Sequence, residues 1–295
     1  MSTAATTFSR LARAKVNLRL EVGPKTGMLH TMVSAVAALD LADVIRFSPA
    51  ADGFAVRCEG LELAERDNLA WRAAHALGVQ PPSVSVAIEK HIPTQAGLGG
   101  GSSDAAATIQ GLALILTRNG AALPAQRLAK AAASVGSDVP SFLAGGLRIV
   151  SGTGEVVTPR PCPAPPWGVV LLRPAVGSST GRAYELLDTA GVPHALEADA
   201  TGAAGSVCDA FCAGDFERFL FLLHNDFTTI IERELPAVAH ARQRLERAGA
   251  QGTILCGSGS CVAGFFGHRA AAIDGAQRIA LDTGEWMSVT TFSVD

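Results

Sequence analysis

The sequence predicts an α+β protein of two domains, and three observations lead to that prediction. Residues 11–22 alternate apolar and polar side chains, which is typical of a half-buried β-strand. A glycine-rich loop, Gly97–Gly101, joins a second predicted strand to a helix. The proline-rich patch Pro159–Pro166 separates two halves that each contain strands and helices. We therefore expect domains at residues 1–160 and 161–295.

Composition restricts the class of protein. The chain has 295 residues, of which 48% are hydrophobic and 17% charged, so a large core is expected and disorder is not. The formal net charge is −3 without a basic block, which gives nucleic-acid binding no support. No apolar run reaches the roughly 18 residues of a membrane span. Because residues 1–13 also lack the apolar centre of a signal peptide, we expect a cytoplasmic protein with no membrane partner.

The six cysteines are scattered and form no Cys-x-x-Cys pair. They are Cys58, Cys162, Cys208, Cys212, Cys256 and Cys261. In a long chain without a secretion signal, we expect reduced thiols. Cys208 and Cys212 lie one helical turn apart and are a possible metal pair, but no histidine stands near enough in the sequence to complete such a site.

In the first half, strand and helix patterns follow one another with clear turn signals. The expected elements are a strand at 11–22, a turn at 23–30, a strand at 39–47, a strand at 54–58 that could pair with it as a hairpin, a helix from 67 or 68 that Gly78 ends, a strand at 84–88, a helix ending near 117, a helix at about 124–135, and a hairpin of strands at 147–150 and 155–158.

The second half predicts more helix than the first. The expected elements are a strand at 167–172, a helix at 181–187, a weakly patterned loop at 192–205, helices at 207–213, 216–234 and 237–248, a strand–glycine turn–strand unit at 252–266, a helix at 269–282 and a strand at 286–292. No internal repeat or low-complexity tract is visible.

The glycine-rich loop is suited to a phosphate group. Four glycines in five residues remove the Cβ atoms that would keep a ligand from the backbone. Ser102, Ser103 and Asp104 are good N-cap residues, and a helix start offers unpaired N–H groups and a positive dipole end. No Gly-Lys-Ser/Thr follows, so the loop is not a Walker A loop, and it matches the Rossmann fingerprint poorly. The alternative is a loop that only caps its helix.

The segment from Pro93 to Ala106 resembles the phosphate loop of the GHMP kinases, the family of galactokinase, homoserine kinase and mevalonate kinase. Further similar segments follow the family's order along nearly the whole chain. These are Ala14–Leu18, Asp67–Leu69, Gly136–Pro140, Gly152–Glu155, Asn225–Phe227 and Cys256–Cys261. The resemblance implies an N-terminal domain like domain 2 of ribosomal protein S5 and a ferredoxin-like C-terminal domain.

The resemblance also implies that ATP and Mg²⁺ are the cofactors. The residues implied to bind the nucleotide are Asn68, Pro93, Ala96, Gly97, Leu98, Gly99, Gly100, Gly101, Ser102 and Ser103. Asn68 has an alternative role as a plain helix cap. The sequence identifies no magnesium ligand.

Two residues are the candidates for catalysis of phosphoryl transfer to an alcohol. Asp138, in Gly-Ser-Asp-Val-Pro, matches the family aspartate that is the proposed base, and Lys15 matches the family lysine beside it. A lysine there keeps the carboxylate ionised and offsets charge on the transferring phosphoryl group. The alternatives are that Asp138 caps the turn at Pro140 and that Lys15 lies on a solvated strand face.

The acceptor is a small molecule, and Asn17, His30 and Tyr184 are the residues implied to bind it. The most similar family members have Asp-Gly-Tyr-His where this chain has Gly27–His30, and their tyrosine is expected to stack on a cytosine base. Leu29 offers no π face, so it should stack less well. A different alcohol acceptor and a catalytically silent nucleotide-binding protein stay open as alternatives. The sequence does not give the oligomeric state.

Overall fold

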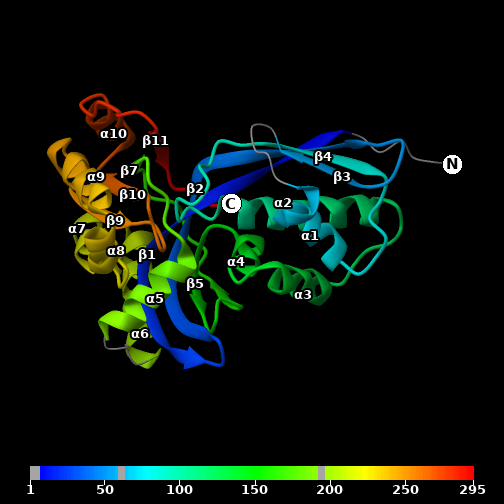
Figure 1. Cartoon of the computed structure of the whole chain (residues 1–295), viewed down its shortest axis with the longest axis horizontal. Coiled ribbons are helices and arrows are strands. Elements are labelled where there is room, and N and C mark those ends of the chain that lie inside the picture. Colours follow the sequence, from blue (N-terminus) through cyan, green and yellow to red (C-terminus); the bar gives the residue numbers. More distant parts are fainter. Residues whose placement is uncertain (1–6, 59–63, 192–196) are drawn as a thin grey trace. The chain divides into compact units, whose positions relative to one another are not determined.

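The structure is a computed structural model that describes residues 7–58, 64–191 and 197–295. The chain forms two compact units that are not consecutive in sequence (Figure 1). Unit 1 consists of residues 1–14, 41–92 and 99–144. Unit 2 consists of residues 15–40, 93–98 and 145–295. The division into domains at residue 160 stays a prediction.

Strands and helices of the described residues follow the predicted order closely. The strands are β1 (Phe8–Thr26), β2 (Leu29–Pro49), β3 (Ala55–Cys58), β4 (Val84–Glu89), β5 (Leu147–Ser151), β6 (Val156–Pro159), β7 (Gly168–Arg173), β8 (His224–Asn225), β9 (Gly252–Leu255), β10 (Val262–Phe266) and β11 (Trp286–Thr291). The helices are η1 (Glu65–Asp67), α1 (Leu69–Ala76), α2 (Gly100–Arg118), α3 (Ala125–Val135), α4 (Val139–Ala144), α5 (Thr180–Ala190), α6 (Glu197–Ala213), α7 (Phe216–Leu222), α8 (Thr228–Glu234), α9 (Pro236–Arg247) and α10 (Arg269–Ala276). The long strands β1 and β2 contribute residues to both units.

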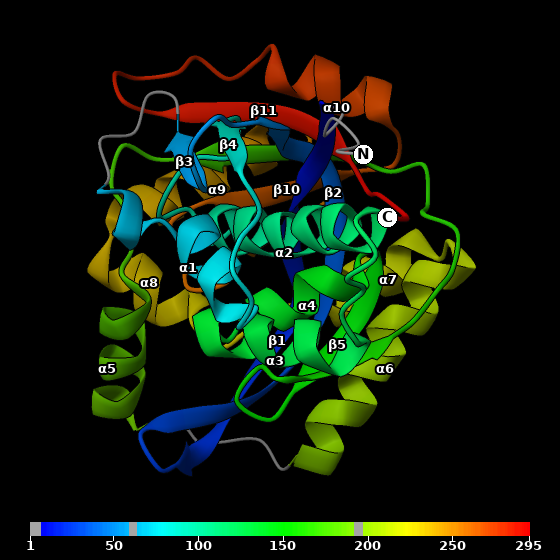
Figure 2. The same ribbon diagram turned by 90° about the vertical axis from the view of Figure 1, so that its right-hand side faces the viewer.

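Unit 1 places helices against a small sheet. Residues 44–49 of β2 pair antiparallel with β4, and β3 pairs parallel with β4. The expected hairpin of residues 54–58 with residues 39–47 is therefore wrong, because β4 lies between the two strands. Helices α1, α3 and α4 pack against α2, as Figure 2 shows.

The core of unit 1 depends on a close approach of α2 to the sheet. Phe47 of β2 is 1% exposed, and a Cβ added to Gly111 of α2 would lie 2.1 Å from its ring. Ile88 of β4 and Leu112 of α2 are fully buried in the same cluster. Glycine at position 111 thus allows the helix to rest directly on the aromatic ring.

Unit 2 contains a four-stranded antiparallel sheet in the order β11-β7-β10-β9. Helices α9 and α10 pack against it, and Val170 and Leu172 of β7 are buried beneath them with Leu245 of α9. The predicted strand–glycine turn–strand unit is confirmed as β9 and β10. The hairpin β5–β6 is also confirmed.

One predicted helix, at residues 216–234, is divided in the structure. Helix α7 ends at Leu222, the two-residue strand β8 pairs parallel with β1, and α8 begins at Thr228. The Asn225 side chain accepts a hydrogen bond from the Phe227 backbone N–H at 2.9 Å. An asparagine that bonds local backbone in this way favours a turn over a helix interior, and periodicity alone does not reveal it.

The predicted loop at residues 192–205 is wrong from residue 197 onward, and residues 192–196 lie outside the described part. Helix α6 covers 197–213, and it buries Ala200, Ala204, Val207 and Phe211. These residues recur at helical spacing, but the small side chains of alanine and glycine give a weak apolar signal.

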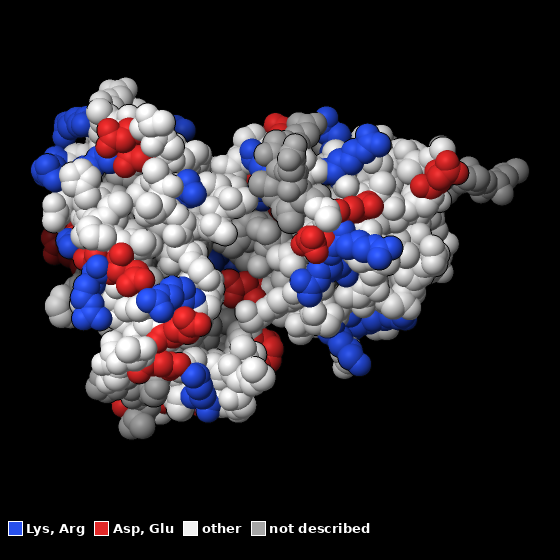
Figure 3. Space-filling view, viewed as in Figure 1, with Lys and Arg blue, Asp and Glu red and all other residues white. Residues whose placement is uncertain are grey.

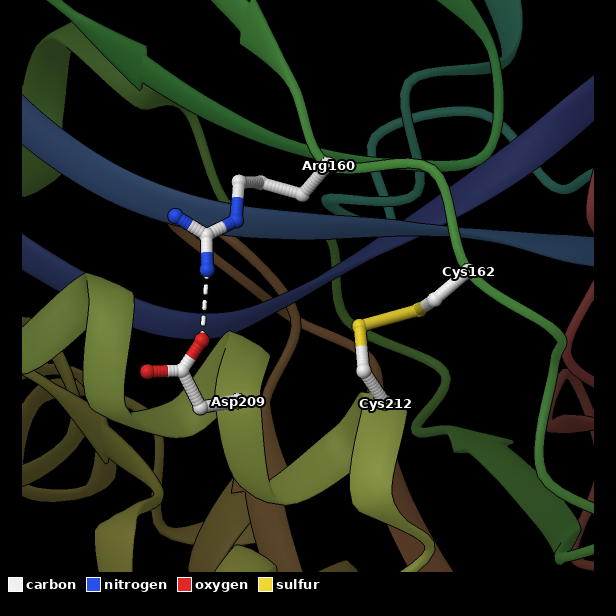
Figure 4. The surroundings of a disulfide bond; sticks show 4 residues. All are labelled: Arg160, Cys162, Asp209 and Cys212. Carbon is white, nitrogen blue, oxygen red and sulfur yellow. Dashed lines mark hydrogen bonds and ion pairs between the residues drawn. A yellow bond between two sulfur atoms is a disulfide. The ribbon is translucent and has the colours of Figure 1, made fainter.

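A disulfide joins the proline-rich segment to α6 within unit 2 (Figure 4). The Cα atoms of Cys162 and Cys212 are 5.5 Å apart. Two residues away, Arg160 forms an ion pair with Asp209, also on α6. The expectation of reduced thiols is therefore wrong for this pair, and so is the alternative that Cys208 and Cys212 bind metal together. The two cysteines are 50 residues apart in the sequence, so no local spacing of cysteines indicates that they pair.

Unit 1 buries three charged groups together, and we name them the acid–lysine cluster: Asp43, Lys90 and Asp104. The Lys90 ammonium donates to Asp43 and, at 2.7 Å, to Asp104. Asp43 is 0% exposed and Asp104 4%. Burial raises the pKa of Asp104 to about 7, the Lys90 charge opposes that rise, and repulsion by Asp43 adds to it. Burial lowers the pKa of Lys90, but the two carboxylates together hold it above its usual value.

The surface carries both signs of charge. Figure 3 shows basic and acidic side chains interspersed on the face that it draws. On the helices of unit 2, Arg242 forms ion pairs with Glu232 at 2.6 Å and with Glu246 at 2.9 Å. Among the described residues, no helix is long and apolar enough to cross a membrane.

Breaking the disulfide should lower stability. Cys212→Ser, or reduction of the wild type, frees a closed segment of 50 residues, which costs about 2–4 kcal/mol of unfolding free energy. Urea unfolding with and without reductant measures this loss. Cys58→Ser, which leaves the cross-link intact, is the control. Equal stabilities with and without reductant, together with titratable thiols at both positions, would contradict the assignment.

The stability should also decrease with rising pH because of Asp104. Between about pH 4 and pH 7, the folded chain holds a proton on this carboxyl that the unfolded chain has released, so the unfolding free energy falls as pH rises. Each pKa unit corresponds to about 1.4 kcal/mol. Urea unfolding at pH 5 and pH 8 should show a smaller difference for Asp104→Asn than for the wild type. Identical pH dependence in the two proteins would refute the raised pKa.

Candidate functional site

Lys15 lies on β1 but is not on a solvated face. Lys15 is 6% exposed to solvent and Asn17 is 4% exposed, so the alternative of a solvated strand face is wrong for both residues. The Lys15 ammonium donates to Asn17 Oδ1 at 2.5 Å. Because a buried ammonium is costly without partners, the burial of this lysine indicates a site rather than a surface charge.

Asn17 continues the hydrogen-bond network onto β2. Its Nδ2 donates to Ser34 Oγ at 2.8 Å, and the Ser34 hydroxyl donates to the Arg19 carbonyl at 2.6 Å. These bonds fix the side-chain amide, so its oxygen faces the ammonium of Lys15. Strand alternation places Lys15 and Asn17 side by side, as the sequence predicts, while Ser34 comes from the neighbouring strand.

The first half of the phosphate loop, residues 93–98, lies against this strand in unit 2. The Lys15 backbone N–H donates to the Leu98 carbonyl at 3.0 Å, and the Cys261 N–H donates to the Ala96 carbonyl at 3.2 Å. Gly97 has a φ of +75°, and a Cβ there would lie 1.7 Å from the Cys256 carbonyl oxygen. Glycine is therefore required at position 97 for both its conformation and its lack of a side chain.

The glycine turn between β9 and β10 packs on the same atoms. A Cβ added to Gly257 would lie 3.0 Å from Lys15 Nζ and 3.2 Å from the Gly97 carbonyl. Asn225 donates from Nδ2 to the carbonyls of Leu255 and Gly257, each at 2.8 Å, and so fixes the turn. Three segments far apart in sequence thus meet around the lysine within unit 2.

The second half of the loop belongs to unit 1 and begins α2 earlier than predicted. Gly99 is the N-cap in a left-handed conformation with a φ of +73°, and the helix starts at Gly100. Ser103 donates its hydroxyl to the Gly100 carbonyl at 2.8 Å. The expectation that Ser102, Ser103 or Asp104 caps the helix is wrong. The consequence is that glycine N–H groups, unobstructed by side chains, form the first turn.

Asn68 caps α1 in unit 1. Its Oδ1 accepts a hydrogen bond from the Ala70 N–H at 2.9 Å. The helix it starts borders the loop, since a Cβ added to Gly101 would lie 3.4 Å from Leu69 Cδ1. The capping role is confirmed, and contact with a nucleotide stays a prediction.

Asp138 stands at the start of the short helix α4 in unit 1, and it is exposed. Its backbone carbonyl accepts a hydrogen bond from the Ser141 N–H at 3.2 Å. A carboxylate at such a position is accessible to an acceptor hydroxyl.

His30 and Tyr184, both expected to bind substrate, lie together in unit 2. Their rings stack with centroids 5.1 Å apart. His30 Nδ1 is 3.0 Å from the Gly23 carbonyl, and Nε2 is 3.0 Å from Asp188 Oδ1. The pKa of Asp188 lies below its usual value, first because Lys25 donates to it. Leu29, the departure from the most similar family members, directly precedes His30 in the sequence and is 57% exposed.

Several supporting residues were missed in the sequence. Ser34 and Asp188 are ordinary residues in their segments, and only the fold shows that they orient Asn17 and His30. The acid–lysine cluster was missed as well, although Lys90 and Asp104 flank the glycine-rich loop. A lysine and an aspartate at the two ends of such a loop are a signal that could have been used.

Family models match both parts of the chain. The model described as the GHMP kinases N terminal domain matches residues 68–146, and that of the GHMP kinases C terminal matches residues 207–281. The first match includes the phosphate loop and Asp138.

Relatives match over most of their length. A 4-diphosphocytidyl-2-C-methyl-D-erythritol kinase of Geobacillus sp. (strain WCH70) is 34% identical over 87% of each chain, and one of Pelotomaculum thermopropionicum is 35% identical over 92% of each. A crystal structure of 4-(cytidine 5'-diphospho)-2C-methyl-D-erythritol kinase has 29% identity and a TM-score of 0.77, covering 96% of this chain and 99% of that chain.

A likeness in fold extends further. A homoserine kinase from Cytophaga hutchinsonii has a TM-score of 0.71 at 18% identity, covering 99% of this chain and 96% of that chain. Together with the relatives and the family models, the structural likeness confirms the expected two-part GHMP kinase fold. The chain therefore belongs to the GHMP kinases and is a small-molecule kinase of that family.

Proposed function

We propose that the chain acts in the cytoplasm as an ATP-dependent kinase of the non-mevalonate isoprenoid precursor pathway. Its reaction would transfer the γ-phosphoryl group to the 2-hydroxyl of 4-diphosphocytidyl-2-C-methyl-D-erythritol. The observation that carries this proposal is the identity of 34–35% with kinases of that name over 87–92% of the chain. The packing of the phosphate loop and the glycine turn around Lys15 supports it.

The nucleotide would bind through its phosphates at the glycine-rich loop. Gly99, Gly100 and Gly101 present backbone N–H groups at the start of α2, where the helix dipole also favours an anion. Residues Pro93, Ala96, Gly97 and Leu98 form the approach to this turn, and Ser102 and Ser103 follow it. Asn68 would contact the nucleotide from the start of α1.

Asp138 and Lys15 would carry the chemistry. The Asp138 carboxylate takes the proton of the acceptor hydroxyl, whose oxygen then attacks the γ-phosphorus while the bond to the β-phosphate oxygen breaks. Lys15 offsets the negative charge that builds on the transferring group. Asn17 holds the Lys15 ammonium at 2.5 Å and fixes its direction.

Mg²⁺ would complete the charge balance of the phosphates. Among the described residues, no group of three His, Cys, Asp or Glu side chains could hold a metal ion. Magnesium in kinases usually binds through substrate phosphates and only one or two protein oxygens, so a dedicated cage is not needed. The ion would therefore be held mainly by the nucleotide, and its charge would lower the repulsion between the phosphates and the attacking oxygen of the acceptor.

The acceptor would lie against His30 and Tyr184. The Tyr184 ring stacks on His30 and makes an edge contact with Phe227 at 5.0 Å, so it is fixed on two sides. Aromatic faces of this kind bind a nucleobase by stacking. Leu29 supports a second candidate function, a GHMP kinase with a different alcohol acceptor, because it replaces the tyrosine expected to stack on cytosine.

The proposed reaction predicts a selective acceptor. The purified protein should release ADP from ATP and Mg²⁺ at a strongly increased rate with 4-diphosphocytidyl-2-C-methyl-D-erythritol, and not with homoserine, mevalonate or galactose. Coupled detection of ADP measures each rate. ATP binding without stimulation by the cytidyl compound would reject this acceptor and favour the second candidate function.

Asp138→Asn is the matched variant for the same assay. It removes the base but keeps the size of the side chain, so turnover should fall by at least about 100-fold while ATP affinity changes little. An unchanged rate would exclude Asp138 as the base. Loss of ATP binding in this variant would instead assign Asp138 to the nucleotide site.

A further inference from the structure

We propose that the acid–lysine cluster is a positioning device for the nucleotide: Lys90, held by Asp43 and Asp104, fixes the two ends of the phosphate loop relative to each other. This inference rests on the proposed nucleotide role of that loop. All three residues belong to unit 1, and none of them contacts the reacting atoms in the proposed mechanism.

Asp43 fixes the chain where it leaves β4. One carboxylate oxygen, Oδ1, accepts hydrogen bonds from the backbone N–H groups of His91 at 2.6 Å and Ile92 at 2.8 Å. The other oxygen accepts from Lys90. Since Asp43 is fully buried on β2, the first residues of the loop are bound to the sheet rather than to solvent.

Asp104 fixes the chain where it returns as α2. It lies in the second turn of the helix and accepts a hydrogen bond from Lys90 at 2.7 Å. Gly100, the first helical residue, rests on the same lysine, because a Cβ there would lie 3.3 Å from Lys90 Nζ and 3.0 Å from Ile92 Cγ2. One ammonium group therefore supports the first turn of the helix and binds its second turn.

The cluster buries two carboxyl groups beside one ammonium, which a stability role alone explains poorly. Two carboxylates share one ammonium, and Asp104 Oδ1 is buried with no hydrogen-bond partner among the described residues. Replacing a buried ionic group by apolar residues is often neutral or stabilising. The arrangement instead fixes the end of β4 relative to the start of α2, because the ammonium can bind both carboxyl groups only when these two segments are correctly placed.

Other charged groups near α2 do not change this assignment. The helices packed against α2 carry Arg72 and His75 on α1 and Arg127 and Lys130 on α3, and Asp138 precedes α4. The charge effects on Asp104 come from Lys90 and Asp43. Burial is the main cause that raises the pKa of Asp104, and the charge of Asp43 raises it further, so the protonated form of Asp104 is favoured.

That protonated form suggests a conservative replacement. An asparagine amide is uncharged, like the protonated carboxyl, and keeps an oxygen that can accept from Lys90, whereas alanine cannot accept a hydrogen bond. The positioning role therefore predicts that Asp104→Ala raises the dissociation constant of a non-hydrolysable ATP analogue by about tenfold, which is about 1.4 kcal/mol. Asp104→Asn should stay within about threefold of the wild type. Isothermal titration calorimetry measures both, and the KM for ATP should follow while the KM for the acceptor stays constant.

A second buried ion pair provides the matched control. Arg244 and Glu285 lie in unit 2 at 2.7 Å, with side chains 12% and 9% exposed. Arg244→Met should lower the melting temperature but leave the affinity for the analogue unchanged. Equal affinities of Asp104→Ala and Asp104→Asn, or an equal loss in Arg244→Met, would overturn the positioning role. A wild type that binds no nucleotide would instead reject the proposed function.

Hydrogen exchange in the wild type tests the same role without a variant. Binding of the ATP analogue at the start of α2 should slow amide exchange of the peptide containing His91 and Ile92, whose N–H groups bind Asp43. Binding that protects the first turn of α2 and leaves these two amides unchanged would show that the cluster does not couple the two ends, and so would contradict the proposal.

Discussion

The site in unit 2 depends on how closely three backbone segments approach one another. The strand of Lys15, the loop residues 96–98 and the glycine turn at 256–261 are joined by backbone hydrogen bonds of 3.0 and 3.2 Å. At Gly97 the space for a Cβ is already occupied by the Cys256 carbonyl, which leaves no room for another residue type. Because Gly257 also borders the Lys15 ammonium, the same close approach determines where the proposed catalytic charge lies.

The buried polar side chains follow from this packing. Lys15 is only 6% exposed, Asn17 accepts a hydrogen bond from its ammonium, and Ser34 in turn orients Asn17. Asn225 donates to the carbonyls of Leu255, at the end of β9, and of Gly257 in the glycine turn. Each side chain in the network is oriented by a hydrogen bond to the next one. Such a network fixes the orientation of the Lys15 ammonium where little water can solvate it.

Local patterns predicted much of this structure. Alternation identified β1, glycine and proline signals placed the ends of α1 and α3, and the order of motifs indicated the family. Features that depend on residues far apart in the sequence were not predicted. The place of β4 between β2 and β3 and the disulfide between Cys162 and Cys212 each depend on partners far along the chain. Their residue types are common, so no pattern within one segment distinguishes them.

In the proposed site, too, local patterns predicted some residues, and others became evident only from the fold. The loop was found from its four glycines in five residues, and Lys15 was found from its match to the family lysine. Asp43, Ser34 and Asp188 act through neighbours that only the fold provides. Roles in catalysis and in nucleotide binding remain predictions for the individual residues. Membership of the family comes from the whole chain and does not depend on any one of them.

The measurement that tests the central claim most directly compares two glycine-to-alanine variants. Gly97→Ala would place a Cβ 1.7 Å from the Cys256 carbonyl, while Gly120→Ala, with a similar φ of +79°, has nothing within 4 Å. Both lose roughly 1–2 kcal/mol to the left-handed conformation. Gly97→Ala should in addition lower kcat/KM for ATP by at least about 100-fold, and Gly120→Ala should not. Equal activities of the two variants would contradict the claim that this close approach builds the site.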